Sequence, residues 1–383
     1  MQQRLGTYIT KKVSGESFKA YIPAKLPPQP AIELEKLSGL LEKAALAIAQ
    51  LNSITKSIPN TALFTYMYVR KEALLSNQIE GTQSSFADLI LFEHDQKPEV
   101  SLDDVEEVSN YVKALNYGLK RLRGGFPMSM RLLREIHTVL LSGGRGSSKL
   151  PGELRRSQNW IGGTRPGNAL FVPPPVENLA DCLADLEKFL HNDTLPVLIK
   201  AGIAHVQFET IHPFLDGNGR LGRLLITLLL VDGGIIDAPI LYLSLYLKQN
   251  RSTYYDLLQE VRTNGTWETW LEFFLNGILS SSKQAIKTTE DINNIFAEDF
   301  VKINTLGRAR FSCAQTLEYL KQLPQISVQV LAAALEISLP TARSSLNHLV
   351  DLGVIEEVSG NKRGKIYVYR KYLNILEKGA EPL

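Results

Sequence analysis

The stretch from His212 to Arg223, HPFLDGNGRLGR, gathers residue types that bind and transfer phosphate groups. Its GNGRLG core spells the G-x-G-x-x-G pattern of dinucleotide-binding folds, which needs a preceding strand and a surrounding βαβ unit. The residues before it, LIKAGIAHVQFETIHPF, instead have the apolar spacing of a helix. No acidic residue ends a second strand about twenty residues later, and no G-x-x-x-x-G-K-[ST] occurs. The sequence therefore excludes a Rossmann site and a P-loop.

A tight turn between two helices explains the same glycines. Pro213 ends the preceding helix and Arg220 lies near the start of the next, so residues 213–219 form the connection. Gly217 and Gly219 allow successive backbone N–H groups to converge, and the following helix adds its positive end. This combination predicts an anion site suited to a diphosphate.

The side chains of the stretch fit the same chemistry. Arg220 and Arg223 are three residues apart on a helix and can bind further phosphate charge, and Asn218 offers an amide. Asp216 supplies a hard oxygen ligand for a phosphate-bound magnesium ion. His212 is the group of this stretch whose pKa suits general-base catalysis.

The stretch resembles the H-x-F-x-[DE]-G-N-G-R-x-x-R signature of Fic domains and matches it at every fixed position. Fic domains usually transfer AMP from ATP to a hydroxyl group of a target protein and release pyrophosphate. The resemblance implies that His212 is the catalytic base, that Asp216 binds Mg²⁺ and that Arg223 binds the γ-phosphate. It also implies that Phe214 anchors the loop in the core. The residues expected near the nucleotide are Gln207, Phe214, Gly217, Asn218, Gly219, Arg220, Arg223 and Asn250.

An upstream motif, SNQIEG, runs from Ser76 to Gly81 on a helix predicted over about 65–81. It resembles the [ST]-x-x-x-E-[GN] inhibitory motif of Fic proteins. The resemblance implies that Glu80 pairs with Arg223, removes the γ-phosphate contact and leaves ATP in a non-productive pose. In some relatives the same glutamate supports removal of AMP, so an AMP-removing enzyme with the same site remains an alternative.

A second segment, PGELRRSQNWIGGTRPGNALFVPPP, places two apolar-aromatic pieces around a Gly/Pro-rich turn, which predicts a β-hairpin. It resembles the flap that holds the target segment by backbone pairing in Fic proteins. A hairpin with a purely structural role is the alternative. The predicted flap residues are Trp160, Ile161, Gly162 and Gly163.

One helix face carries His205, Glu209 and His212 at i, i+4 and i+7, which is the spacing of a metal-binding stripe. Zinc needs a third or fourth strong ligand, and the sequence offers no matched partner, so a hydrogen-bonded helix histidine is favoured for His205. The histidines without a recognisable constellation are His94, His137, His191 and His348.

The first 300 residues otherwise have a hydrophobic period near 3.6, so we expect a mainly α fold. The resemblance implies that this fold is a Fic-type helical bundle with a small hairpin flap. Prolines before residue 31 indicate an extended lead-in. Apolar residues recur at helical spacing from Ile32 onward, and further helices are predicted at roughly 65–80, 103–122, 129–141, 176–191, 195–211, 219–233, 240–248, 250–263, 267–280 and 282–303.

The last segment has a different pattern. SVQVLAAALEI and LPTARSSLNHLVDLG predict two short helices, and VIEEV and KIYVY predict two strands around the basic tip SGNKRG. This order is typical of a winged helix. We therefore expect an N-terminal extension with the inhibitory helix (1–102), a catalytic domain with following helices (103–305) and a winged-helix domain (306–383).

The sequence predicts a Mg²⁺- and ATP-dependent protein adenylyltransferase that modifies a hydroxyl group of a target protein or of itself. A DNA-binding regulator with a nucleotide-sensing body is the alternative, since 308–371 holds nine Lys/Arg against five acids. Pairing of two such bodies as a homodimer is also compatible with the resemblance. The net charge of +2 indicates no global attraction to nucleic acid. The apolar run 224–231 is too short for a bilayer, and Cys182 and Cys313 show no disulfide pattern, so a cytoplasmic location without membrane partners is expected.

Overall fold

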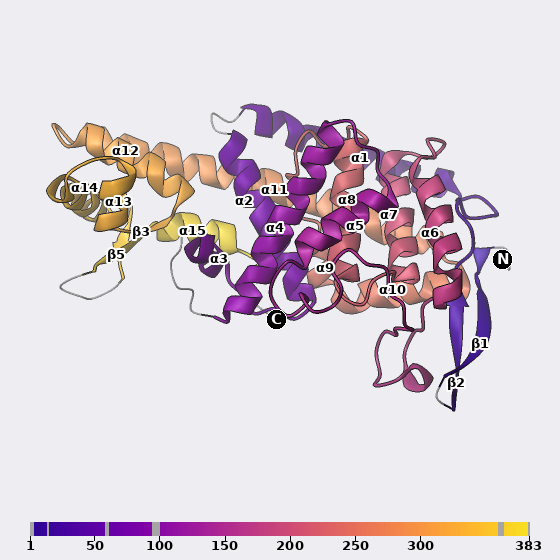
Figure 1. The fold of residues 1–383 in the computed structure, drawn as a ribbon. Helices are drawn as coiled ribbons and strands as arrows, with labels where there is room; N and C mark the ends of the chain where they lie inside the picture. The colour runs from indigo at the N-terminus through magenta and orange to yellow at the C-terminus, as the bar shows by residue number, and fades with distance from the viewer. Residues whose placement is uncertain (1–3, 14, 58–60, 94–99, 359–363, 382–383) are drawn as a thin grey trace.

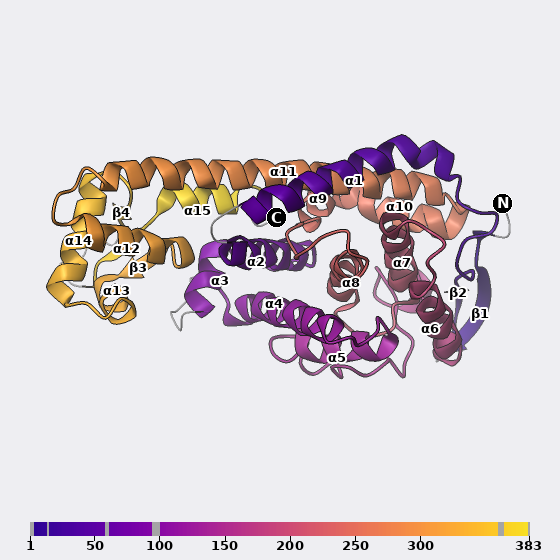
Figure 2. The ribbon, with the colours of Figure 1, turned by 90° about the horizontal axis from the view of Figure 1, so that it is seen from above.

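The computed structural model describes residues 4–13, 15–57, 61–93, 100–358 and 364–381. The chain is mainly α-helical, which confirms the fold class predicted from the hydrophobic period, and it forms an elongated molecule (Figures 1 and 2). The helices of the body are α1 (Leu34–Ser57), α2 (Thr61–Ile79), α3 (Phe86–Glu93), α4 (Leu102–Arg123), α5 (Met130–Leu140), α6 (Val176–Leu190), α7 (Val197–Ile211), α8 (Asn218–Asp232), α9 (Ser244–Gln249), α10 (Arg251–Asn264) and α11 (Trp267–Ile303).

Helices α7 and α8 form the centre of the body. Every residue of α7 from Leu198 to Ile211 is buried, and so is every residue of α8 from Arg220 to Leu230. Such helices are covered on all sides, here by α4 and α5 next to α8 and by α6 and α11 next to α7. The turn that joins α7 to α8 therefore starts and ends in fully packed helices.

Helix α11 is one continuous helix of 37 residues that runs along α1 and extends to the C-terminal elements (Figure 2). The prediction of two helices, 267–280 and 282–303, is wrong at their junction. Ser281 and Ser282, at the predicted junction, are both buried within the helix. Serine is only a weak helix former, and packing against neighbouring helices overrides that preference.

The N-terminal lead-in is also different from the prediction. Strands β1 (Thr7–Val13) and β2 (Glu16–Ile22) form an antiparallel hairpin, with Thr7 opposite Ile22. Phe18 and Ala20 point from β2 into a small apolar cluster with Val172. Residues 7–12 of β1 are all exposed or half-buried, so this strand lacks the alternation of buried and exposed residues by which a sequence pattern identifies a strand.

The C-terminal segment contains α12 (Arg310–Gln322), β3 (Gln325–Ser327), α13 (Val328–Ala334), α14 (Leu339–Asp351), β4 (Glu356–Glu357), β5 (Ile366–Val368) and α15 (Arg370–Glu377). Its strands form an antiparallel sheet in the order β3–β5–β4. The two predicted helices and two predicted strands are present, whereas α12, β3, α15 and, in the body, α3 were not predicted. The assignment to the winged-helix class and the three domain boundaries remain predictions.

Residues 378–381, which follow α15, lie against α2 and α9. Lys71 of α2 donates a hydrogen bond to a backbone carbonyl of this segment at 2.9 Å, and Gln78 donates to another at 2.8 Å. The Lys248 ammonium group donates to Oε1 of Gln78 at 2.7 Å and to a third carbonyl of the segment. These three side chains are buried, so the segment is part of the core around α2.

Among the described residues, none of the helices combines the length and the apolar character needed to cross a lipid bilayer.

We expect Lys248→Met to lower the free energy of unfolding by about 1–3 kcal/mol, because the buried Gln78 side chain and the carbonyl of Glu381 would each lose a hydrogen-bond donor. Urea unfolding followed by circular dichroism measures this. Lys287→Met is the matched control, since its ammonium lies 3.8 Å from Asp291 on an exposed face of α11. Equal losses in the two variants would contradict this account of the 378–381 segment.

Candidate functional site

A cavity of about 540 Å³ opens where the α7–α8 turn meets α2, α4 and α10. Most of the residues singled out from the sequence contribute to its wall. The lining residues are Glu80, Glu107, Arg145, Trp160, Ile161, Gly162, Glu209, His212, Leu215, Asp216, Gly217, Asn218, Gly219, Arg220, Arg223, Tyr254, Tyr255, Leu258 and Arg262.

His212 ends α7 in the left-handed region, with φ of 49°, a conformation that costs energy in a residue other than glycine. Its carbonyl oxygen accepts hydrogen bonds from Nε of Arg155 at 3.0 Å and from Nδ2 of Asn159 at 3.1 Å. Burial, together with the positive charge of Arg262, lowers the pKa of His212 to about 4. The imidazole is therefore neutral at pH 7 and can accept a proton.

The turn itself is closed by Asn218. Its Oδ1 accepts a hydrogen bond from the backbone N–H of Phe214 at 2.9 Å, and its Nδ2 donates to the carbonyl of Phe214 at 2.9 Å. Gly217, with φ of 74°, precedes α8 in the left-handed region. The Asn218 side chain thus stabilises the turn, and its expected contact with phosphate would have to come from its backbone N–H.

His137 of α5 packs against the turn and forms a hydrogen bond with it, although the sequence gave no reason to select this residue. Its ring stacks on Phe214 with centroids 3.8 Å apart. Nε2 donates to the carbonyl of Asp216 at 2.9 Å, and Nδ1 accepts from the N–H of Gly152 at 2.8 Å. Burial lowers the pKa of His137 to about 4, which keeps the ring neutral for this pair of bonds.

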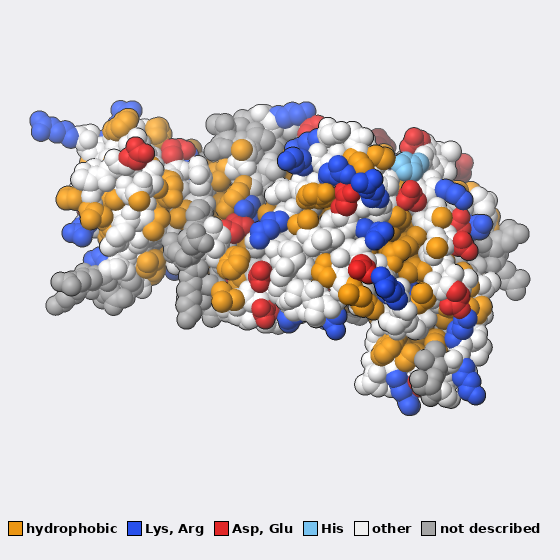
Figure 3. Space-filling view, viewed as in Figure 1, with side chains coloured by type: hydrophobic (Ala, Val, Ile, Leu, Met, Phe, Trp, Pro, Cys, Tyr) orange, Lys and Arg blue, Asp and Glu red, His pale blue; other side chains and the backbone are white. Residues whose placement is uncertain are grey.

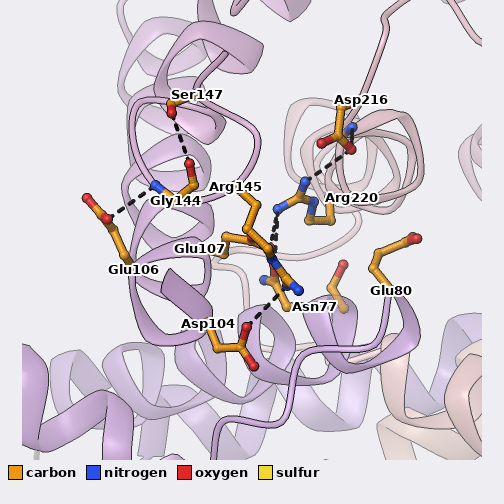
Figure 4. Close-up of polar contacts among 12 residues, drawn as sticks. Asn77, Glu80, Asp104, Glu106, Glu107, Gly144, Arg145, Ser147, Asp216 and Arg220 are labelled. Atoms are coloured by element: carbon orange, nitrogen blue, oxygen red, sulfur yellow. Dashed lines mark hydrogen bonds and ion pairs between the residues drawn. The ribbon is translucent and has the colours of Figure 1, made fainter. Parts of the chain in front are cut away.

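Arg220 is buried between two carboxylates, as Figure 4 shows. Its Nη1 lies 3.0 Å from Oε2 of Glu107 on α4, and its Nη2 lies 3.5 Å from Oδ1 of Asp216. Arg145 binds the same Glu107 at 2.9 Å and also pairs with Asp104 at 3.2 Å. Glu107 and Arg145 were not identified from the sequence, because they come from segments far from the signature.

The predicted contact between Glu80 and Arg223 is present. Nη2 of Arg223 lies 2.6 Å from Oε1 of Glu80, and the same guanidinium donates to Oγ and to the carbonyl of Ser76 at 2.8 and 2.9 Å. Burial alone would raise the pKa of Glu80, but the Arg223 charge and hydrogen bond outweigh it and lower that pKa. Gly81, the last residue of the motif, has φ of 99°, a conformation that favours glycine.

Gly219 allows the close approach of α2 to this turn. A Cβ atom at this position would lie 2.3 Å from Oε1 of Glu80 and 3.1 Å from Nη1 of Arg223. The glycine is therefore required for the ion pair as well as for the exposed start of α8.

The flap is not the hairpin that the sequence predicts. Its two arms share one antiparallel bridge, between Ile161 and Phe171, and a short 3₁₀ helix, Pro166–Asn168, forms the tip. Prolines and left-handed glycines keep the ladder from extending. Trp160, Ile161 and Gly162 line the cavity, whereas Gly163 does not. Strand β2 holds the flap through a hydrogen bond from Tyr21 N–H to the carbonyl of Val172, at 2.9 Å.

Three residues expected near the nucleotide lie outside the cavity: Phe214, which is fully buried, Gln207 and Asn250. Gln207 donates to the carbonyl of Ala24 at 2.9 Å, and Asn250 donates to the carbonyl of Tyr246 at 2.9 Å. One turn beyond Asn250, the side chains of Tyr254 and Tyr255 do line it. Nucleotide binding by this region remains a prediction.

His205, in the predicted histidine stripe on α7, is a hydrogen-bonded helix histidine. Nδ1 of His205 lies 2.9 Å from the carbonyl of Gly222, and Nε2 lies 2.9 Å from the Tyr254 hydroxyl, so both ring nitrogens are used. His94 lies outside the described residues, as do Lys362 and Arg363 of the basic tip.

The residues of the turn fit a magnesium ion that is bound mainly through substrate phosphates. The Asp216 side chain lines the cavity and is 40% exposed, so an oxygen can reach an ion there. The described residues contain no cluster of three or more His, Cys, Asp or Glu side chains that could bind a metal ion by themselves. One carboxylate plus phosphate oxygens is a usual ligand set for Mg²⁺, which keeps several waters.

Residues 38–120 match the model of the Fic/DOC family N-terminal region, and residues 127–230 match that of the Fic/DOC family. Among curated proteins, the chain is 30% identical to the protein adenylyltransferase Fic of Drosophila virilis over 235 residues, which is 60% of this chain and 44% of the relative. It is 32% identical to the Drosophila melanogaster protein of the same name over 162 residues, 42% of this chain and 30% of the relative. The chain thus spans less than half the length of these curated relatives.

Two solved structures share the fold. A Fic family protein from Desulfovibrio desulfuricans G20 superimposes with a TM-score of 0.59 at 20% identity, covering 89% of this chain and 97% of the other. A Fic domain-containing signalling protein from Bacteroides thetaiotaomicron gives a TM-score of 0.52 at 21% identity, covering 64% of this chain and 97% of the other.

We expect His137 and His205 to lower the free energy of unfolding when the pH falls from 7 to 5, against an opposite contribution from the Glu72 and Glu209 carboxyl groups, whose pKa values burial raises to about 7. The pKa values of His137 and His205 are about 4 and 3 in the folded protein, against about 6.5 when unfolded. Between these values the unfolded state binds protons that the folded state does not, so each histidine costs about 2 kcal/mol at pH 5.

Urea unfolding at the two pH values measures this loss. His137→Gln should reduce the difference between pH 7 and pH 5, whereas His191→Gln, at an exposed position after α6, should leave it unchanged. The same pH dependence in wild type and His137→Gln would show that the account of His137 is wrong.

Proposed function

The chain belongs to the Fic/DOC family, and we propose that it is a protein adenylyltransferase that uses ATP with Mg²⁺ and is inhibited by its own Glu80. The observation that carries the proposal is the convergence on one cavity of a neutral base, His212, a glycine-rich helix start and two buried arginines, Arg220 and Arg223. Phosphate transfer depends mainly on positioning and on neutralisation of charge, which is what these groups supply.

In the proposed reaction, the backbone N–H groups at the start of α8 bind the α- and β-phosphates, and Arg220 neutralises part of their charge. His212 takes the proton from the target hydroxyl while that oxygen forms a bond to the α-phosphorus. The bond from the α-phosphorus to the bridging oxygen breaks, and pyrophosphate leaves with the electron pair. Asp216 would hold Mg²⁺, which neutralises phosphate charge when bound.

The target segment would lie along the flap. The edge of the flap at Trp160, Ile161 and Gly162 faces the cavity, and the single bridge leaves further backbone groups of this loop free to pair with an extended peptide. The 38% exposed Trp160 side chain offers an apolar contact beside His212. The chemistry thus favours an extended segment with a hydroxyl-bearing side chain.

Inhibition follows from competition for one guanidinium. Arg223 is 2% exposed and already binds Glu80 and Ser76, so a γ-phosphate can bind it only if the Glu80 carboxylate leaves. A γ-phosphate that approaches Arg223 while Glu80 is bound would be repelled by the Glu80 carboxylate. The triphosphate would therefore bind in a displaced, unreactive position. Removing the carboxylate leaves Arg223 available and keeps its hydrogen bonds to Ser76.

We expect Glu80→Gly to raise the transfer of label from α-labelled ATP with magnesium to protein by tenfold or more, with cell lysate as the source of targets. His212→Ala in the same background should lower it by about 100-fold or more, because general-base catalysis contributes about 10²–10⁴. Glu290→Gly, the same substitution at an exposed position of α11, is the control and should leave label transfer at the wild-type level. Absence of label from all variants, with α- and γ-labelled ATP alike, would refute the proposed activity.

DNA binding by the C-terminal segment is a second candidate, favoured by one observation. Arg343, Ser344 and Asn347 are exposed together on α14, the second of the two predicted winged-helix helices. Lys and Arg side chains also project from the end of the molecule that α12 to α14 form (Figure 3). This arrangement would place donors toward a DNA groove.

A gel-shift titration with generic duplex DNA tests this candidate. We expect a shift that weakens as salt increases and that Arg343→Ala weakens, because phosphate contacts release counterions. Arg131→Ala, at an exposed position of α5, is the control and should bind as wild type does. No shift at low salt would exclude DNA binding.

A further inference from the structure

The carboxylate of Glu209 has no role in the proposed reaction, although it lies in the cavity wall. Its side chain is 8% exposed, and its Oε1 has no hydrogen-bond partner among the described residues. A Cβ atom at Gly222 would lie 2.3 Å from this oxygen, so only a glycine leaves room for the carboxylate against α8. An unpaired buried carboxylate is costly, and such a group in a cleft is a candidate for function.

Glu209 presents two acceptors to the ring of His212, one turn further along α7. Its Oε2 lies 3.9 Å from Nδ1 of His212, and its carbonyl oxygen lies 3.4 Å from the same nitrogen. Acceptors at Nδ1 favour the tautomer that carries hydrogen there, which leaves Nε2 unprotonated. Such distances commonly shorten when the substrate binds.

The other charges around this pair make an imidazolium unfavourable. Arg262 and Arg155 lower the pKa of His212, and Arg223 lies close to Glu209, whereas Glu80 is the other negative group. Arg262 comes from α10 and is itself buried. A proton that moves to His212 therefore enters a site with three guanidinium groups, and a neighbouring carboxylate can offset them.

We propose that Glu209 is a positioning residue for His212, which keeps Nε2 free to accept the target proton and stabilises the imidazolium that forms. This inference rests on the proposed AMP transfer. During the step, the hydroxyl proton moves to Nε2 while the hydroxyl oxygen bonds to the α-phosphorus, and the electron pair of the broken P–O bond leaves with pyrophosphate. Glu209 gains and loses no proton in this step.

The ionised form of Glu209 alone can act in this way. A protonated carboxyl group carries no charge and would leave the imidazolium uncompensated among the guanidinium groups, although the Glu209 carbonyl at 3.4 Å would still face Nδ1. Burial raises the pKa of Glu209 to about 7. Activity should therefore increase as the pH rises through about 7, well above the pKa of about 4 for His212 itself.

The first test is ¹⁵N NMR of the His212 ring in the full chain, with the signals assigned by comparison with His212→Ala. In wild type we expect hydrogen on Nδ1 at pH 8 and an inflection of the ring shifts near pH 7 as Glu209 gains a proton. Glu209→Gln should abolish this inflection, and Glu209→Ala serves as the second variant where Gln impairs folding. Flat wild-type shifts between pH 6 and 8 would overturn the inference without any variant.

The second test is the single-turnover rate of label transfer in the Glu80→Gly background. Glu209→Gln should lower the rate about 10–100-fold and remove its rise through pH 7, while the KM for ATP stays within twofold. Glu93→Gln is the control, since it removes a carboxylate that pairs with Arg70 at 2.6 Å outside the cavity. An unchanged rate and pH profile in Glu209→Gln would refute the positioning role. Absence of transfer in Glu80→Gly itself refutes the proposed function instead, and the NMR measurement still decides whether Glu209 titrates against His212.

Discussion

The burial of two guanidinium groups at the start of α8 is the constraint that organises this protein. Arg220 and Arg223 have side chains 5% and 2% exposed, and a buried charge is tolerated only with a partner. Segments from three parts of the chain supply these partners: Glu107 of α4, Asp216 of the turn and Glu80 at the end of α2. The body must therefore bring α2, α4 and α8 together before the cavity can exist.

The same constraint links substrate binding to inhibition on the proposed function. The two buried guanidinium groups need an anionic partner when no nucleotide is bound. A phosphate can replace a carboxylate in this role, because both anions present oxygens in bidentate geometry. Glu107 stays with Arg220 and Arg145 in a network, whereas Glu80 is 38% exposed and sits at a helix end. The less enclosed carboxylate is the one that a triphosphate could displace.

The sequence predicted the parts of this site that are local in the chain. The turn, the helix start and the spacing of Arg220 and Arg223 follow from one short stretch, and the Ser76–Gly81 motif placed Glu80 beside Arg223. The sequence could not reveal His137 or Glu107, because their roles depend on which distant helices pack around the turn. The strand hairpin under the flap was missed for the same reason, since it is stabilised by Val172 and not by its own pattern.

Helix α2 connects the cavity to the C-terminal elements. Ser76 and Glu80 face Arg223, while Gln78, two residues from each, points to the opposite side and binds residue Ala380. The two faces of one helical turn are thus fixed by different partners, one in the cavity and one in the 378–381 segment. A shift of α2 toward Arg223 would strain its contacts with the 378–381 segment, and a shift toward that segment would strain the contact with Arg223. The position of Glu80 therefore depends on the 378–381 segment as well as on Arg223.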